Sequence, residues 1–381
     1  VLRDLNENHG KTILVIEHHT EYIADYCKHV MLMRDGQVRW ILPTEEALQR
    51  VEELEECNIF PPQVTQAAHR LRRAGRLPAD ILLPTTVDGG KTAFAGLHYI
   101  SRERPAPAVP DGESAVSFQD VSLAYRSVKG EPRTVFDGLN LNIRKGEKVA
   151  LIGSNGAGKS TLMKLMVGLL KPNSGTVSLF GEAMGDKKAE DLSRQISLVY
   201  QNPEEMFIKD SIRADIAYAM EVRNVPEWEK RTGELLERFR LTELADRDGR
   251  LMSGGQMRRA SLAIGVALEP GILLLDEPTA NLDIATRREI MGVLEDMKDI
   301  IQTAVIATHD MQLVCQWAER IIVLCNGQVV ADGARDEIFA RTDVVERVGI
   351  RPPEIFSMAQ ALDSRSMCYT IDEFLSSFQE V

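Results

Sequence analysis

The chain has 381 residues, of which 44% are hydrophobic and 27% charged, so it can bury a sizeable core and hold about two or three domains. Its formal net charge of −12 argues against a nucleic-acid binder, because affinity for a phosphate backbone depends on clustered lysine and arginine. Five cysteines without CxxC spacing favour a reducing compartment, and there is no run of about eighteen apolar residues. Any membrane attachment is therefore expected to come through a partner.

The stretch at 13–38 returns near the other end of the chain, at 305–329. An offset of 291 residues relates His18 to His309 without a gap. The same offset relates further pairs: Gly36 and Gly327, Gln37 and Gln328, and the double prolines at 61–62 and 352–353. Chance does not hold about seventy residues in one register, so this is an internal repeat of domain size.

The repeat predicts that the first copy is incomplete in this sequence. The second copy starts near Ala115, and residue 1 corresponds to residue 292, so the first copy lacks its opening 177 residues. Because the chain also begins without methionine, we expect a fragment of a longer tandem protein.

Hydrophobic periodicity predicts a helix end, a strand, a helix, a strand and a hairpin turn over residues 1–42, with RDG and CNG as matching turns of the two copies. A charged helix is expected at 45–56. The Pro- and Gly-rich stretch at 72–114 is typical of a linker. The expected domains are a remnant of the first copy at 1–71, the linker at 72–114, a complete second copy at 115–333 and a C-terminal extension at 334–381.

A glycine-rich turn in the second copy, GSNGAGKST, matches GxxxxGK[ST] between an apolar strand and an expected helix. Its backbone N–H groups and the helix N-terminus suit a phosphate, whereas a turn without a ligand is disfavoured by the order of strand, turn and helix. Lys159 is expected to reach the β- and γ-phosphates, and Ser160 to coordinate Mg²⁺. The candidate phosphate-binding residues are Gly153, Ser154, Asn155, Gly156, Ala157, Gly158, Lys159, Ser160 and Thr161.

The segment ILLLDEP at 272–278 is an apolar strand that ends in two carboxylates. Asp276 is expected to hold Mg²⁺, and Glu277 to polarise the attacking water as a general base. Taken alone, an ordinary strand-to-turn pair of acids would be the better interpretation.

A second polar, glycine-rich helix start lies between these motifs, at Ser253, Gly254, Gly255 and Gln256. It is also suited to an anion. Because the chain already has a phosphate loop, this helix start is predicted to serve the phosphate of a neighbouring domain.

In this order the motifs resemble those of ATP-binding cassette (ABC) ATPases, over about residues 115–333. The resemblance implies an α/β fold of the P-loop NTPase type, with a parallel-sheet core, an antiparallel β subdomain and a helical signature subdomain, preceded by the C-terminal part of a second copy. Met252 stands where the family usually has leucine, a substitution that conserves volume and apolarity.

The resemblance also assigns roles to single residues. Gln201, in the Q-loop, would sense Mg²⁺ and couple to the membrane partner, and His309 would contact the γ-phosphate, with His18 as its first-copy counterpart. Asp283 would belong to the D-loop, and Tyr125 would stack on adenine. Taken one at a time, each of these residues could equally be an ordinary core or surface residue without a functional role.

Within that family, the segments QNPEEMF and RADIAYAMEVRNVP and the C-terminal extension resemble the ATPase of energy-coupling factor (ECF) importers of vitamins and transition metals. Some members fuse two such ATPases in one chain. The resemblance implies ATP and Mg²⁺ as cofactors and a peripheral place on the cytoplasmic face of the membrane. The implied partners are an integral-membrane coupling subunit, a substrate-binding membrane subunit, and a second cassette, either an intact first copy or a homodimer partner.

Three alternatives remain open on sequence grounds. A tandem ABC ATPase acting on the ribosome would also have two cassettes, but a short Pro-rich linker and a net charge of −12 disfavour it. The chain could serve another ABC transporter class. A cassette that only regulates is disfavoured because Lys159, Asp276, Glu277 and His309 are all present.

Overall fold

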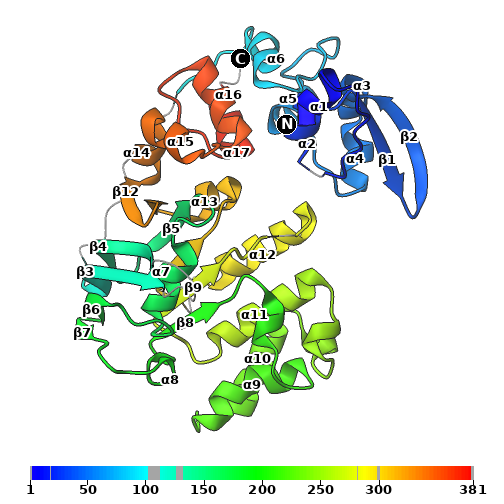
Figure 1. Cartoon of the computed structure of the whole chain (residues 1–381). Helices are drawn as coiled ribbons and strands as arrows, with labels where there is room; N and C mark the ends of the chain where they lie inside the picture. Colours follow the sequence, from blue (N-terminus) through cyan, green and yellow to red (C-terminus); the bar gives the residue numbers. More distant parts are fainter. Residues whose placement is uncertain are drawn as a thin grey trace. The chain divides into compact units, whose positions relative to one another are not determined.

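The computed structural model describes residues 2–17, 19–101, 112–125, 132–280, 282–297 and 301–378. The chain forms two compact units. Unit 1 comprises residues 1–105, 283–285 and 352–381, and unit 2 comprises residues 106–282 and 286–351. Figure 1 shows the ribbon of each unit.

The core of unit 2 is a six-stranded sheet in the order β12-β11-β5-β10-β9-β8. Its strands are β5 (Lys148–Gly153), β8 (Ile196–Val199), β9 (Ile272–Asp276), β10 (Thr303–Ala307), β11 (Arg320–Cys325) and β12 (Gln328–Ala334). All neighbours pair in parallel except β11 with β12. Every residue of β9 and β10 is buried, as expected of strands covered on both faces.

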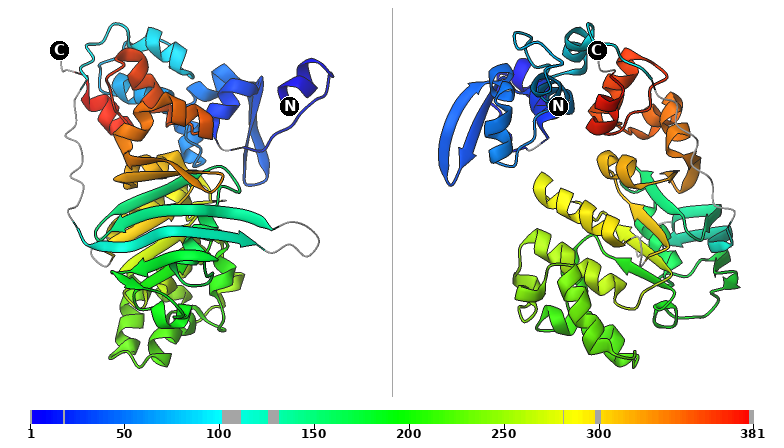
Figure 2. Two further views of the ribbon diagram at one scale, coloured as in Figure 1. Left: turned by 60° about the vertical axis from the view of Figure 1, so that its left-hand side comes forward. Right: turned by 180° about the vertical axis from the view of Figure 1, so that it is seen from behind.

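A second, antiparallel sheet has the order β4-β3-β6-β7. It consists of β3 (Ser114–Tyr125), β4 (Arg133–Arg144), β6 (Ser174–Leu179) and β7 (Glu182–Ala183). Its inward side chains, such as Phe118 and Ile143, share one core with Leu151 of β5 and Leu274 of β9. The long β3 and β4 ribbons run side by side in the left view of Figure 2.

Helices complete unit 2. Helix α7 (Lys159–Met166) follows β5, and the short α8 (Ala189–Leu192) precedes β8. Between β8 and β9 lies a helical subdomain made of η1 (Pro203–Met206), α9 (Ile212–Val222), α10 (Trp228–Arg238), η2 (Thr242–Leu244), η3 (Gly249–Leu251) and α11 (Gly254–Val266). Helices α12 (Ile284–Asp296) and α13 (Met311–Trp317) flank β10 in the chain. The parallel core, the antiparallel subdomain and the helical subdomain predicted for the second copy are all present.

The first copy repeats the last third of the second copy element by element. Its elements are α1 (Leu2–Glu7), α2 (Thr20–Tyr26), β1 (His29–Arg34), β2 (Gln37–Pro43), α3 (Thr44–Gln49), α4 (Val51–Glu56) and α5 (Gln63–Arg73). From α2 onward they match α13, β11, β12, α14 (Arg335–Ala340), α15 (Thr342–Val348) and α16 (Glu354–Leu362), all at the offset of 291. Even the bulge recurs, between Leu32 and Met33 and between Val323 and Leu324. Both hairpins turn through two residues with positive φ, the geometry of a type I′ turn.

Two elements expected in the first copy differ in the structure. Residues 11–17 form no strand, and Leu14 and Ile16 are 84% and 95% exposed. Their counterpart β10 is held between β5 and β9, and the counterparts of those two strands lie outside this sequence, so the segment has no ladder to join. The charged helix expected at 45–56 is divided at Arg50 into α3 and α4. His18 lies outside the described residues.

The interval 72–114, predicted as a linker, contains structure. Helix α6 (Val87–Phe94) lies in it, and Leu77, Leu83 and Phe94 are buried. Helical periodicity is weak here because Gly89 and Gly90 occupy two positions of α6. Residues 102–111 lie outside the described part. The expected C-terminal extension is also divided, since α14 and α15 belong to unit 2 and α16 and α17 (Ile371–Ser376) to unit 1.

Unit 1 therefore brings together two helical pairs from the two copies, α5 with α6 and α16 with α17. Helix α16 packs on α6, and α17 packs on α5. They share a core that includes Val64, Phe94, Ile355, Met358 and Phe374. This core is separate from that of unit 2.

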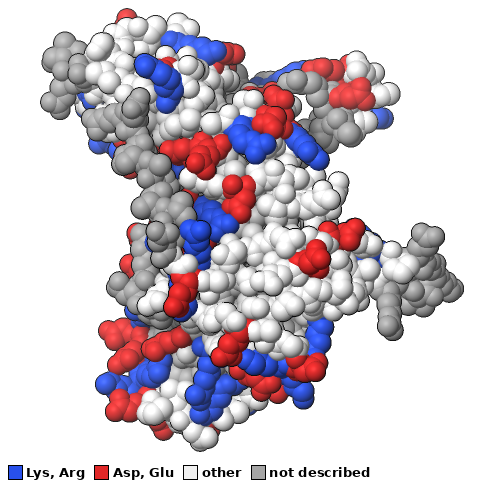
Figure 3. All heavy atoms as spheres, turned by 90° about the vertical axis from the view of Figure 1, so that its left-hand side faces the viewer, with Lys and Arg blue, Asp and Glu red and all other residues white. Residues whose placement is uncertain are grey.

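The surface charge and the apolarity of the helices bear on two classes considered above, nucleic-acid binders and membrane-spanning proteins. On the face drawn in Figure 3, Lys and Arg lie among Asp and Glu in mixed groups, and the residues described there form no broad basic field. In the described part of the chain, no helix combines the length and apolarity needed to cross a membrane.

The two hairpin turns provide a matched test of packing. Gly36 and Gly327 have φ of 75° and 76°, but a Cβ at Gly36 would contact nothing, whereas a Cβ at Gly327 would overlap the carbonyl oxygen of Val135. We expect Gly36→Ala to lower the free energy of unfolding by about 1 kcal/mol, from backbone strain. Gly327→Ala should lower it by about 3 kcal/mol or more, because β4 must move. Denaturant unfolding of both variants measures the difference, and equal effects would contradict the close approach.

Candidate functional site

The phosphate loop of unit 2 is built from glycines at positions that disfavour other residues, through positive φ or close packing. Gly156 and Gly158 have φ of 82° and 109°. A Cβ at Gly158 would lie 2.9 Å from the ring of Phe136, and one at Gly153 would overlap the carbonyl oxygen of Leu324. The loop is thus held close to β4 and β11, directly before the N-terminus of α7, where a phosphate is favoured.

Lys159, the first residue of α7, lies buried against this loop. Its Nζ donates to the carbonyl oxygen of Gly153 at 2.7 Å. Burial lowers the pKa of Lys159, while the nearby carboxylates Glu277 and Asp276 act to raise it. The ammonium group is therefore placed between the loop and the acidic ends of the sheet.

Asp276 ends β9, and its carboxylate accepts a hydrogen bond from Ser160. Burial raises the pKa of Asp276, and the hydrogen bond from Ser160 and the charge of Lys159 lower it. Its Oδ1 atom is buried without a hydrogen-bond partner. A buried carboxylate oxygen lacking a partner, next to a hydroxyl, fits a hard cation such as Mg²⁺ that takes its other ligands from phosphates and water.

Glu277 and His309 lie directly against each other. The Nδ1 atom of His309 is 2.9 Å from Oε1 of Glu277, and the Thr308 hydroxyl donates to Oε2 at 3.1 Å. Glu277 is buried and has φ of 47°, an unusual backbone for a side chain with a Cβ, whereas His309 is exposed. The hydrogen bond to Glu277 raises the pKa of His309. A buried base with an exposed histidine beside it suits activation of a water at the mouth of the phosphate loop.

Sequence reasoning missed the residues that fix this histidine. Asp310 caps α13 by accepting from the N–H groups of Gln312 and Leu313. It also accepts from the Thr279 hydroxyl at 3.0 Å and pairs with Arg287 at 3.5 Å. The cap signal was readable in THDMQL, whereas the partners, Thr279 in the turn after β9 and Arg287 of α12, were not.

Tyr125 ends β3, and its hydroxyl lies 3.2 Å from that of Thr161 on α7. Its side chain is 41% exposed, so a ring face is open to a ligand beside the phosphate loop. Arg133, paired with Tyr125 across the antiparallel sheet, has a guanidinium nitrogen 3.8 Å from where a Cβ of Gly156 would be. Arg133 is a further candidate phosphate contact that no motif indicated.

The second helix start is well formed and exposed. Ser253 caps α11, and Gln256 returns the bond to the backbone of Ser253, which completes a capping box. Gly255 lies against Thr286, where a side chain would not fit. In the described part of the chain, no hydrogen bond or ion pair joins residues 253–256 to the phosphate loop of the same cassette.

Gln201 also has an exposed side chain, but its backbone is fixed by a residue that the motifs did not indicate. Arg258 of α11 is buried and donates to the carbonyl oxygens of Tyr200 and Gln201 at 2.9 and 2.6 Å. Burial lowers the pKa of Arg258 to about 10. The Q-loop and the signature helix are therefore linked by one guanidinium fork.

Asp283, the predicted D-loop residue, directly precedes α12.

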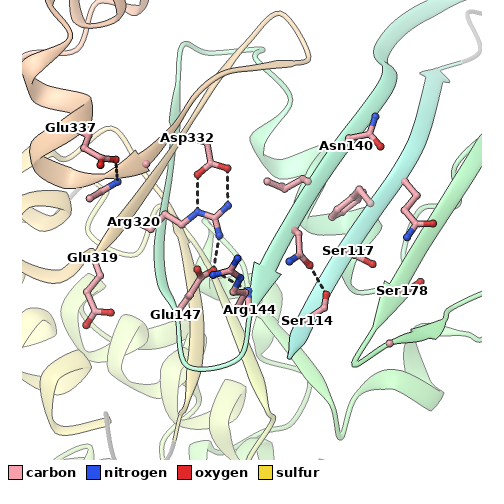
Figure 4. Close-up of a pocket in the computed structure, with 17 residues that line it drawn as sticks. Ser114, Ser117, Asn140, Arg144, Glu147, Ser178, Glu319, Arg320, Asp332 and Glu337 are labelled. Atoms are coloured by element: carbon pink, nitrogen blue, oxygen red, sulfur yellow. Dashed lines mark hydrogen bonds and ion pairs between the residues drawn. The ribbon is translucent and has the colours of Figure 1, made fainter. Parts of the chain in front are cut away.

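A separate hollow of about 980 Å³ lies on the outer side of β3, β4 and β12. Figure 4 shows Arg320 bridging Asp332 and Glu147, with all three distances at 2.7 Å. These charges satisfy one another and fasten the β11–β12 hairpin to β5. None of the predicted site residues lines this hollow, so it is structural rather than the nucleotide site.

Comparisons with known proteins agree with this geometry. The family model described as ABC transporter matches residues 136–280. A putative ABC transporter ATP-binding protein of Methanosarcina acetivorans is 30% identical over 99% of this chain and 62% of its own length. The energy-coupling factor transporter ATP-binding protein EcfA1 of Lacticaseibacillus paracasei is 36% identical over 68% of this chain and 93% of its own length.

Among solved structures, cbiO1 from Clostridium perfringens, described as part of the ABC transporter complex cbiONQ, has a TM-score of 0.54 at 32% identity. The match covers 64% of this chain and 97% of cbiO1. The relatives matched over nearly all of this chain are longer, and the chain spans between 62% and 66% of the first three.

Neighbouring arginines of α11 offer a matched pair for testing the Q-loop fork. Arg258→Met leaves two buried carbonyl groups without their donor and should cost about 3 kcal/mol of unfolding free energy. Arg259→Met removes only a partly exposed pair with Glu289 and should cost less than about 1 kcal/mol. Denaturant unfolding checks both values. Equal costs would show that the fork does not hold the Q-loop.

The contact of His309 with Glu277 predicts a titration. Because the folded pKa of His309 is raised above 6.5, protonation of His309 stabilises the fold fully below that pH, and the contribution is lost as pH rises through the raised value. Glu277→Gln should bring the pKa of His309 back toward 6.5. NMR titration of the imidazole, assigned by its absence in His309→Gln, measures this shift. An unchanged pKa in Glu277→Gln would mean that the two side chains do not pair.

Proposed function

Because this chain belongs to the ATP-binding cassette (ABC) family of transporter ATP-binding proteins, we propose that its second copy hydrolyses ATP with Mg²⁺ to power a membrane importer. One observation carries the proposal. Lys159, Glu277 and His309 converge at the carboxyl ends of β5, β9 and β10, three neighbouring parallel strands. Ligands of open α/β sheets bind at that end of the strands.

Each residue has a role that its surroundings support. Lys159 neutralises the β- and γ-phosphate oxygens once a nucleotide replaces the loop carbonyls as its partner. Glu277 accepts a proton from the attacking water, and His309 positions that carboxylate and contacts the γ-phosphate. Mg²⁺, held through Ser160, Asp276 and Gln201, would offset the charge of the phosphates. Tyr125 would stack on the adenine.

The signature helix supplies the other half of a site on a different cassette. Ser253 and Gly254 are exposed at the positive end of α11, with their backbone already organised by the capping box. An ATP held by one cassette would be covered by the signature of another, so that binding closes the pair and hydrolysis opens it. Asp283, beside α12, would line the same contact.

The importer class is proposed to be of the energy-coupling factor type, with a vitamin or a transition metal as cargo. Similarity to EcfA1 and cbiO1, and the element-by-element repeat, support this class over other ABC transporters. The partners would be a membrane coupling subunit, a substrate-binding membrane subunit and a second cassette, with the chain on the cytoplasmic face of the membrane.

The coupling subunit is proposed to contact unit 2 beside the Q-loop. There Phe207 is buried against Gly249, while Ile208 and Leu251 are 61% and 86% exposed. Lys209 lies over the ring of Tyr218 at 4.1 Å, next to these apolar side chains. An exposed apolar strip beside a loop fixed by Arg258 suits an amphipathic helix of a partner.

Catalysis by two half-sites predicts that activity depends on encounters between chains. In this sequence the phosphate loop and the signature each occur once, so specific activity should fall on dilution. Lys159→Ala and Ser253→Arg should each be inactive alone, the first through lost phosphate contacts and the second through a blocked signature. Mixed together, they should regain activity, because the mixed pair has one intact site. ATPase rate against concentration, for single and mixed variants, is the measurement.

A sizing experiment controls for indirect effects of these substitutions. Glu277→Gln should bind ATP without hydrolysing it and accumulate as a dimer in ATP and Mg²⁺. Specific activity that stays flat on dilution of a monomer, together with no recovery on mixing, would exclude two half-sites for this chain.

A further inference from the structure

The two helical pairs of unit 1 exchange their N-terminal caps. Helices α5 and α16 each follow a double proline, and neither Pro62 nor Pro353 provides a side-chain cap. Instead, the N–H of Ile355 donates to Oε1 of Gln63 at 2.9 Å, and the N–H of Val64 donates to Oε2 of Glu354 at 3.1 Å. Each helix start is therefore capped by the first residue of the other helix, 291 positions away.

The exchange is symmetric in position but not in chemistry. Gln63 and Glu354 occupy equivalent places, yet one is a neutral amide and the other an acid. Both lie at the junction, where Gln63 is buried. Burial and the charges of Glu21 and Asp25 on α2 raise the pKa of Glu354 to about 8. Hydrogen bonds from the backbone N–H groups of Val64 and Gln63 act in the opposite direction and lower this pKa. The junction thus disfavours one carboxylate and would disfavour two more strongly.

Side-chain size is asymmetric in the same way. Beyond the loop that joins the two helices of each pair, equivalent residues of the two copies lie 284 positions apart instead of 291. Thr86, which caps α6, therefore corresponds to Thr370, which caps α17. In that register Gly90 corresponds to Phe374. A Cβ at Gly90 would overlap the sulfur of Met358.

The partner helices show the same pattern. Helix α5 carries Ala67 where α16 carries Met358, and Ala67 and Phe374 are fully buried in one cluster. Small residues of the first copy thus accommodate large residues of the second.

We propose that these three positions select pairing of a first-copy helical pair with a second-copy helical pair, and act against pairing between second copies of two chains. In a pairing of two second copies, Glu354 would meet another Glu354, and Met358 would meet Phe374 instead of Gly90. The first pairing buries two acids that cannot both ionise, and the second overfills the core. The inference does not depend on ATP hydrolysis.

Because the two helical pairs lie in one chain, the rejected pairing can be built within it. The conversion variant Gln63→Glu, Ala67→Met and Gly90→Phe gives the first copy the residues of the second. It should lower the hydrogen-exchange protection factors of the Val64 and Ile355 amides at neutral pH by about tenfold or more, the effect of losing one net hydrogen bond.

Exchanging the residues in both directions is the matched control. Adding Glu354→Gln, Met358→Ala and Phe374→Gly to the conversion variant restores complementarity with the sides reversed, and most of the protection should return. If the conversion variant keeps its protection, the three positions do not select a partner. If protection is lost and the reversed variant does not regain it, the loss is general destabilisation, and the proposal is equally overturned.

Single substitutions test the charge alone. Gln63→Glu should keep protection at both amides near neutral pH, where both acids are protonated, and lose it relative to the wild-type chain above about pH 8, where ionisation of both acids is opposed by the buried junction. Glu354→Gln, with two amides, should keep its protection throughout. Protection factors correct for the intrinsic pH dependence of exchange. If Gln63→Glu matches the wild-type chain above about pH 8, charge plays no part in the selection.

Discussion

The candidate site depends on the position of β10 between β5 and β9. In this register Ala307 faces both Leu151 and Asp276, so the residues that follow each strand emerge side by side. Thr308 and His309 then reach Glu277, and the amide of Glu277 bonds to Ala307. The apolar character of β9 and β10 matters because strands buried on both faces form a rigid support for the residues that follow them.

The same constraint explains the part of the first copy that departs from its sequence pattern. Residues 12–16 correspond to β10, but a parallel strand needs a neighbouring strand to satisfy its backbone, and no described strand pairs with this segment. Without one the segment stays irregular and exposes Leu14 and Ile16. The hairpin β1–β2 has no such requirement, since its hydrogen bonds lie within the segment, and it forms with the turn and bulge of its counterpart.

What the sequence could predict follows the range of the interactions involved. The phosphate loop, the caps of α11 and α13 and the hairpin turns are local patterns, and each was readable from a few adjacent residues. Arg258 could not be recognised, because its two acceptors lie 57 and 58 residues away and nothing in MRR distinguishes it from Arg259. Helix α6 was missed for a related reason. Its two glycines weaken the helical pattern, and Gly90 leaves the space in which Met358, far along the chain, packs.

The exchanged caps also affect when the chain can finish folding. The first helical pair cannot satisfy its N-terminus or bury its apolar side until the second pair exists, and the two are separated by 291 residues of synthesis. At ordinary translation rates that interval is roughly 15 to 60 s, far longer than the formation of a helix. During this time unit 2 can assemble by itself, whereas Val64, Ala67 and Phe94 remain without their partners. A nascent chain of this protein therefore exposes these apolar side chains to chaperones, or to neighbouring nascent chains, until α17 leaves the ribosome.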